Sequence, residues 1–148
     1  MSGTTNVPSI YVLVRRNNKL LFVSRTNTGY KDGSYTLPAG HVEADESFRI
    51  AAARETLEEV GLRVAPADLR HVYTMHRSEH DNGGVRVDVF FEADKWEGEP
   101  KNMEPDKHGE LAWFPVDHLP FDKIMDYQAD VLRAIARGET YAERGWDV

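Results

Sequence analysis

Three glutamates, Glu55, Glu58 and Glu59, stand close together in a stretch with the composition of a helix. Because each residue of an α-helix turns the chain by about 100°, the three side chains share a sector about 100° wide. The small residues Ala51 and Ala52 lie one turn earlier on the same side and leave space for another group. Carboxylates gathered on one helix face indicate either a solvated acidic surface or a site for a divalent cation.

This distribution of charge is unfavourable for the helix itself. Like charges four residues apart, as in Glu55 and Glu59, destabilise a helix by about 0.2–0.5 kcal/mol, and the helix dipole disfavours anions near the C-terminal end. Between Gly40 and Leu62 six acidic residues stand against two arginines, in a chain of net charge −7. Mg²⁺ binds carboxylate oxygens and keeps water ligands that a phosphate can replace. A metal site that receives phosphate therefore explains the crowding.

The spacing of acids, glycines and one arginine in residues 40–62 is specific. It resembles the signature of the Nudix hydrolases, G-x5-E-x7-R-E-U-x-E-E-x-G-U, in which U is a bulky aliphatic residue. Thr56 departs from this pattern at the first U, and we expect its hydroxyl to bond back to the preceding turn. Weaker similarity to the MutT-like, nucleotide-directed members extends over residues 10–120. The matching residues of the signature are Gly40, Glu46, Arg54, Glu55, Glu58, Glu59 and Gly61.

The resemblance implies a fold and a reaction. Nudix hydrolases are α/β/α sandwiches with a mixed β-sheet, so we expect an α+β fold and a single domain over residues 1–148. Residues 1–7 and 139–148 are expected to be peripheral tails. The family uses Mg²⁺, which Mn²⁺ can replace, to hydrolyse a nucleoside diphosphate linked to another moiety. For this chain we expect a nucleoside triphosphate as the substrate.

The resemblance also implies the metal ligands. Glu55, Glu58 and Glu59 would bind the cation through their carboxylates. A backbone carbonyl, that of Ala39 or of Gly40, would join them.

Further roles follow from the same resemblance. Glu46 and Arg54 would orient the metal-binding carboxylates through hydrogen bonds. The base that activates the attacking water varies within the family. We favour Glu58 or Glu59 on the helix, and Glu104 is the alternative, although an acid before a proline can simply be an exposed loop residue.

Four residues are candidates for binding the substrate. Arg25 and Arg77 would contact phosphate, Tyr30 would stack on a base, and Asn102 would bond to a base edge. Each could equally be a solvated or packed residue without a functional role. We interpret the six histidines as bystanders and not as metal ligands.

The surrounding pattern predicts the elements that position these residues. The alternating or continuous apolar runs predict strands at residues 8–16, 19–25, 35–37, 69–75, 85–93 and 111–116. Polar loops are expected at residues 26–34, 78–84 and 96–109. Helical spacing predicts helices at residues 45–60 and 123–137.

The first helix carries the acidic residues, so its boundaries and orientation matter most. Asp45 is the expected N-cap, and Gly61 fits the left-handed residue that follows a helix. Opposite the acids lies a stripe that we expect to pack on the sheet, and it consists of Ile50, Ala53, Leu57 and Val60.

The composition excludes several other classes. An acidic chain is a poor partner for a nucleic-acid polymer, and a chain without cysteine has no disulfide framework. The lack of cysteine also argues against the isoprenoid diphosphate isomerase branch of the superfamily. No apolar run is long enough for a membrane span, and residues 1–6 lack the pattern of a secretory signal. We therefore expect a cytoplasmic protein, a monomer or a homodimer, that binds a small-molecule nucleotide.

Two alternatives to this function stay open. One is a non-catalytic module that senses nucleotides, although such modules often lose acids of the signature and this chain has them all. The other is a hydrolase of a diphosphate that is not a nucleotide.

Overall fold

The computed structural model describes residues 5–27, 29, 31–79 and 84–146. In these residues two α-helices and two short 3₁₀ helices combine with eight strands. The helices are α1 (Phe48–Val60) and α2 (Asp126–Ala136), and the 3₁₀ helices are η1 (Pro66–Asp68) and η2 (Phe121–Lys123). The strands are β1 (Asn6–Arg16), β2 (Lys19–Arg25), β3 (Tyr35–Thr36), β4 (Ala39–His41), β5 (Arg70–Glu79), β6 (Gly84–Ala93), β7 (His108–Pro115) and β8 (Tyr141–Arg144).

The strands form one mixed sheet with the order β3-β2-β1-β6-β5-β8. β1 is its centre: it runs parallel to β6 from Asn6 to Val14 and antiparallel to β2 at Arg15 and Arg16. β4 pairs with β1 across residues 9–11, and β7 pairs with β2. This confirms the expected mixed sheet.

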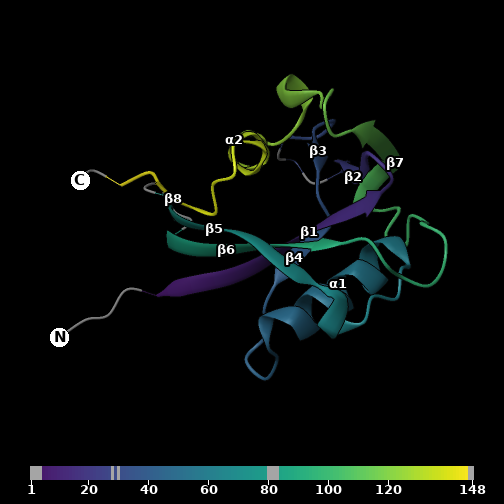
Figure 1. The fold of residues 1–148 in the computed structure, drawn as a ribbon, viewed down its shortest axis with the longest axis horizontal. Helices are drawn as coiled ribbons and strands as arrows, with labels where there is room; N and C mark the ends of the chain where they lie inside the picture. The colour runs from purple at the N-terminus through teal and green to yellow at the C-terminus, as the bar shows by residue number, and fades with distance from the viewer. Residues whose placement is uncertain (1–4, 28, 30, 80–83, 147–148) are drawn as a thin grey trace.

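The two helices cover opposite faces of the sheet, α1 on one side and α2 on the other (Figure 1). Alternate residues of β1 separate two apolar cores: Ile10 and Val12 belong to the core under α1, and Tyr11 and Leu13 to the core under α2. A strand buried on both faces explains the near-continuous apolar run in this part of the sequence. The layers confirm the expected α/β/α sandwich. Neither described helix has the length and the apolar character needed to cross a membrane.

α1 begins three residues later than the sequence suggested. Its N-cap is Ser47, whose Oγ accepts a hydrogen bond from the N–H of Ile50 at 3.2 Å, so the assignment of this role to Asp45 was wrong. The predicted end is confirmed, because Gly61 follows the helix with φ +74°. The Thr56 hydroxyl donates to the carbonyl of Ala52 at 2.7 Å, as expected.

The predicted packed face of α1 is confirmed in part: Val60 is buried and Ala53 packs against the core. Ile50 and Leu57, assigned to the packed stripe, are 48% and 37% exposed. Ala51, Ala52 and Glu59 are buried instead. The two alanines have small side chains that let the helix backbone approach the sheet. With this side of α1 against the sheet, Glu59 at the edge of the acidic sector points inward. The correction places Glu59 in the interior, where the sequence pattern indicated an outward face.

Other boundaries also moved. β5 ends at Glu79 and β6 begins at Gly84, so residues 78, 79 and 84 of the expected loop are strand; residues 80–83 lie outside the described part. β4 was not predicted. β7 begins at residue 108, within the expected 96–109 loop. In the segment interpreted as a C-terminal tail, residues 141–144 form β8 parallel to β5.

Candidate active site

The carboxylate of Glu55 lies directly against the backbone of β4. A Cβ atom on Gly40 would lie 2.1 Å from Cδ and 2.4 Å from Oε1 of Glu55, which is far inside van der Waals contact. The φ of Gly40 is not in the left-handed region. The close approach of Glu55, and not backbone conformation, therefore requires a glycine at this position.

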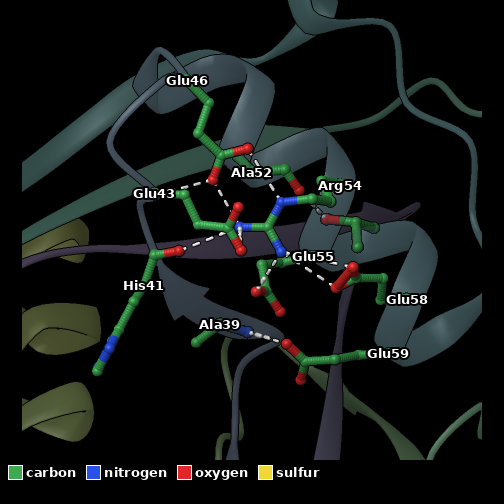
Figure 2. A network of polar contacts seen from close by, with 10 residues as sticks. Ala39, His41, Glu43, Glu46, Ala52, Arg54, Glu55, Glu58 and Glu59 are labelled. Carbon is green, nitrogen blue, oxygen red and sulfur yellow. Dashed lines mark hydrogen bonds and ion pairs between the residues drawn. The ribbon is translucent and has the colours of Figure 1, made fainter.

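Arg54 joins the acids into one network (Figure 2). Its Nε and Nη2 donate to the two oxygens of Glu46 at 3.0 and 2.6 Å. Its Nη1 donates to Glu55 at 2.8 Å and to Glu58 at 3.1 Å. Nη2 also donates to the carbonyl of His41 at 3.1 Å, which ties the guanidinium to β4. One cation thus aligns three carboxylates, and this geometry supports the orienting role inferred for Arg54 and Glu46.

The Glu46–Arg54 pair predicts a pH effect on stability. Hydrogen bonds from Arg54 hold the pKa of Glu46 well below its ordinary 4.5, at about 2. A lowered pKa in the folded state adds stability above the unfolded value, and this is lost as the pH falls from about 4.5 to about 2. The wild type is expected to be more stable than Glu46→Gln at pH 7, with the difference vanishing toward pH 2. Denaturant unfolding across this range tests it; a difference independent of pH would contradict it.

Glu59 is the buried member of the cluster, with 6% of its surface exposed. Its Oε2 accepts a hydrogen bond from the N–H of Ala39 at 3.1 Å. Burial raises the pKa of Glu59 well above its ordinary value, and the neighbouring Glu55 raises it further. Such carboxylates repel each other unless a proton or a cation lies between them. Carboxylate oxygens such as those of Glu55, Glu58 and Glu59 are the ligands that Mg²⁺ and Mn²⁺ prefer, and in this structure Glu55 and Glu58 are bonded to Arg54.

The turn before β7 brings two further groups to Glu59. Oxygens of Glu59 and Glu104 and a ring nitrogen of His108 lie within 4.8 Å of one another. His108 Nε2 is 3.6 Å from Glu59 Oε1, and within the described structure its buried Nδ1 has no hydrogen-bond partner. Burial lowers the pKa of His108, which favours the neutral ring.

The structure thus places His108, which the sequence analysis interprets as a bystander, beside two acids of the candidate site. The available signal was its spacing from Glu104. The two residues are four positions apart in the sequence, and the backbone N–H of His108 donates to the Glu104 carbonyl at 3.0 Å. One tight turn therefore places both side chains together.

Arg25 and Asn102 both lie beside this turn, with different roles. Arg25 at the end of β2 pairs with His108 in β7, and its positive charge contributes to the lowered pKa of His108. Arg25 therefore lies near the carboxylates. The amide of Asn102 is used within its own loop, donating to the His108 carbonyl at 2.8 Å and accepting from the Glu104 N–H at 3.0 Å. These hydrogen bonds show that Asn102 holds the turn, and its contact with a base stays a prediction.

Arg77 is a correction of the expected phosphate contact. It is buried on the α2 side, where its Nε donates to Asp88 at 2.8 Å and its guanidinium lies 3.9 Å from the ring centre of Tyr127. The carboxylates of α1 lie on the opposite side of the sheet, so the structure does not bring Arg77 to them as a phosphate contact. Tyr30 lies outside the described residues.

The chain is similar to known proteins in both sequence and fold. The model of the NUDIX domain matches residues 5–135. The chain is 31% identical over 124 residues to the NAD-capped RNA hydrolase NudC of Shigella flexneri, and 30% identical over 124 residues to that of Escherichia coli O9:H4. Each match includes 76% of this chain and 40% of the relative. The chain therefore spans less than half the length of these curated relatives.

Solved structures share the fold. A MutT NUDIX hydrolase from Burkholderia pseudomallei superposes with a TM-score of 0.78 at 26% identity, covering 87% of this chain and 97% of the other. A MutT protein from Methanosarcina mazei Go1 gives 0.77 at 21% identity, covering 93% and 98%; at that identity the likeness concerns the fold alone. The NUDIX match includes α1, β4 and the turn that carries Glu104 and His108. The match also includes Arg54 and the carboxylates that it joins. Because the match extends over residues 5–135, the chain belongs to the Nudix domain family.

Proposed function

We propose that this chain is a Mg²⁺-dependent Nudix pyrophosphohydrolase that acts on a nucleoside diphosphate linked to another moiety, with a nucleoside triphosphate as the preferred substrate. One observation carries the proposal: Arg54 aligns Glu55 and Glu58 beside the buried Glu59, against the backbone of Gly40. Stability alone does not account for this crowding of acids, whereas binding of a cation and of a phosphate does.

The residues divide the work between binding and orientation. Glu55, Glu58 and Glu59, with the carbonyl of Ala39 or of Gly40, would hold the divalent cation. When bound, the cation stabilises negative charge on the phosphate oxygens and lowers the pKa of water. Arg54 and Glu46 hold the carboxylates in place, and Arg25 is the nearby cation that we assign to a substrate phosphate.

Hydrolysis requires one proton transfer. The oxygen of water forms a bond to phosphorus, the bond to the leaving oxygen breaks, and a base takes the proton of the water. We assign this base to Glu58 or Glu59, with Glu104 as the alternative. The Glu104 side chain is 33% exposed and lies near His108, which places it at the rim of the cluster.

The substitution of Glu104 decides between these bases, because Glu58 would also hold the cation and a loss of kcat in its variant alone does not identify the base. Because a general base contributes about 10²–10⁴-fold, Glu58→Gln is expected to lower kcat by at least about 10²-fold. Glu104→Gln is expected to lower it by about tenfold or less. Steady-state rates with saturating Mg²⁺ and nucleotide provide the measurement. The reverse order of the two effects would assign the base to Glu104.

The function is tested by phosphate or pyrophosphate release from a panel of nucleoside triphosphates, dinucleoside polyphosphates and nucleotide sugars. Release is expected with Mg²⁺, is expected to stop with EDTA, and is expected to return when Mg²⁺ is added in excess. Performing the best reaction in ¹⁸O-water locates the bond that breaks. If no phosphoanhydride is hydrolysed although the nucleotide binds, the chain is a nucleotide-sensing module. Hydrolysis confined to non-nucleotide diphosphates would support the other alternative.

The similarity to NudC favours a second candidate substrate. Those relatives are NAD-capped RNA hydrolases, so the panel includes NAD and NAD-capped RNA. The chain carries a net charge of −7, which disfavours binding to an RNA backbone. We therefore place the nucleoside triphosphate first. A kcat/KM for capped RNA higher than for every nucleoside triphosphate would reverse this order.

A further inference from the structure

We propose that Gln128 of α2 is a positioning residue for the active site on the other side of the sheet. It fixes the backbone that presents the Ala39 N–H to Glu59. This inference rests on the proposed function of the cluster, and it adds to it a residue from an element that carries none of the acids.

Gln128 is a buried amide in the interface between α2 and the sheet, with 1% of its surface exposed. Its Oε1 accepts a hydrogen bond from the backbone N–H of Leu37 at 2.9 Å. Its Nε2 donates to the hydroxyl of Thr36 at 2.7 Å, and that hydroxyl donates to the Leu37 carbonyl at 3.1 Å. A buried amide is costly without hydrogen bonds. Here Oε1 bonds to the backbone of Leu37 and Nε2 to the side chain of the preceding residue, and Nε2 also donates to the Tyr127 hydroxyl at 3.3 Å.

The backbone segment of residues 36–37 leads directly to the active site. Leu37 and Pro38 lie between β3 and β4, outside either strand. The carbonyl of Pro38 accepts from the N–H of Val12 at 2.9 Å. The next N–H, that of Ala39, donates to Oε2 of Glu59 at 3.1 Å. Gln128 is therefore bonded two residues before the N–H that orients Glu59, and three residues before the glycine that receives Glu55.

Packing of α2 does not replace this contact. The start of α2 is joined to the same region through Met125, whose N–H donates to the Tyr35 carbonyl at 3.0 Å. That bond fixes residue 35 and leaves the N–H of Leu37 dependent on Gln128. Without the amide oxygen, a buried donor would have no partner, and the segment would have to move to find one. We infer that movement of residue 37 is transmitted through Pro38 to Ala39 and Gly40, which also pair with Tyr11 and Ile10 of β1.

The test compares Gln128→Met with Leu132→Met. Both positions are buried on α2, one turn apart. Both variants introduce methionine, whose volume is similar to that of glutamine and of leucine. Gln128→Met removes the hydrogen bonds to residues 36 and 37, whereas Leu132→Met removes none. Hydrolysis of the best nucleotide, the dissociation constant for Mn²⁺ and the ¹H–¹⁵N resonances of Ala39 and Gly40 are measured for each.

Gln128→Met is expected to lower kcat by about 10–100-fold with KM within about threefold of the wild type, and to weaken Mn²⁺ binding by a similar factor. The Ala39 and Gly40 amide resonances shift, while Leu132→Met leaves all three properties unchanged. Unchanged resonances and unchanged Mn²⁺ affinity in a folded Gln128→Met protein would overturn the inference. So would an equal effect of Leu132→Met.

Two further outcomes are covered. If Gln128→Met does not fold, Gln128→Asn is used, which withdraws the amide from Leu37 by one methylene. This variant is expected to shift the amide resonances of Ala39 and Gly40. Resonances at their wild-type positions would overturn the inference. If the wild type hydrolyses no phosphoanhydride, the proposed function fails. The Ala39 and Gly40 resonances then still decide whether Gln128 positions the segment.

Discussion

Replacing Glu59 by glutamine is expected to lower kcat by about 10³-fold while the chain keeps a cooperative fold. Glutamine retains an oxygen that can accept from the Ala39 N–H, which donates to Oε2 at 3.1 Å. It lacks the charge needed to hold a divalent cation. Steady-state kinetics at saturating Mg²⁺ measure the loss, and Glu97→Gln at an exposed position is the matched control with wild-type kcat. Wild-type rates for Glu59→Gln would contradict the metal assignment.

The same substitution is expected to stabilise the metal-free protein. Burial and Glu55 raise the pKa of Glu59 in the folded state. When the pKa of a group is higher in the folded state, the group contributes fully to stability at a pH below its unfolded-state pKa. This contribution is lost as the pH rises toward the folded-state pKa. Because glutamine does not titrate, the Tm of Glu59→Gln in EDTA is expected to exceed that of the wild type by an amount that grows as the pH rises above the unfolded value of about 4.5. A difference in Tm between the two proteins that does not change with pH would contradict this account. So would a Tm of Glu59→Gln below that of the wild type at every pH.

Gly40→Ala is expected to lower kcat by about 10²-fold with a small loss of stability. The new Cβ would lie 2.1 Å from Cδ of Glu55. The atoms in its way are the end of a flexible side chain, so the fold adjusts by moving Glu55 rather than the helix. The moved carboxylate leaves its position 2.8 Å from Arg54, where it would bind the cation. Kinetics and thermal unfolding of the purified variant measure both effects.

A double-mutant cycle separates this mechanism from a general disturbance of β4. In the Glu55→Ala background the carboxylate is absent, so Gly40→Ala is expected to change kcat by less than about threefold. Two single effects that multiply in the double variant would show that Gly40 acts through another group.

The active site was more predictable from the sequence than its surroundings. The contacts of Arg54 with Glu46, Glu55 and Glu58 depend on fixed spacing along one helix and the loop before it. Such local geometry follows from helical periodicity. Gly40 was identified by its place in the same pattern, although the structure shows that it is needed for space beside Glu55.

The remaining features depend on tertiary contacts that periodicity does not contain. Exposed Ile50 and buried Ala51 depart from the predicted apolar stripe of α1, because close approach to the sheet favours small side chains over large ones, whereas Val60 is buried as predicted. His108 reaches Glu59 through a turn in a different part of the chain. Arginine often binds phosphate, but Arg77 is hydrogen-bonded to Asp88 of the neighbouring strand β6. Helical or strand periodicity does not reveal this partner.

The most direct test of the central claim is diffraction near the manganese absorption edge from crystals soaked with Mn²⁺ and a non-hydrolysable nucleoside triphosphate analogue. Anomalous peaks are expected within bonding distance of the carboxylates of Glu55, Glu58 and Glu59, with the phosphates of the analogue touching the same ions. An analogue bound elsewhere, or bound with no manganese at these three glutamates, would contradict the account.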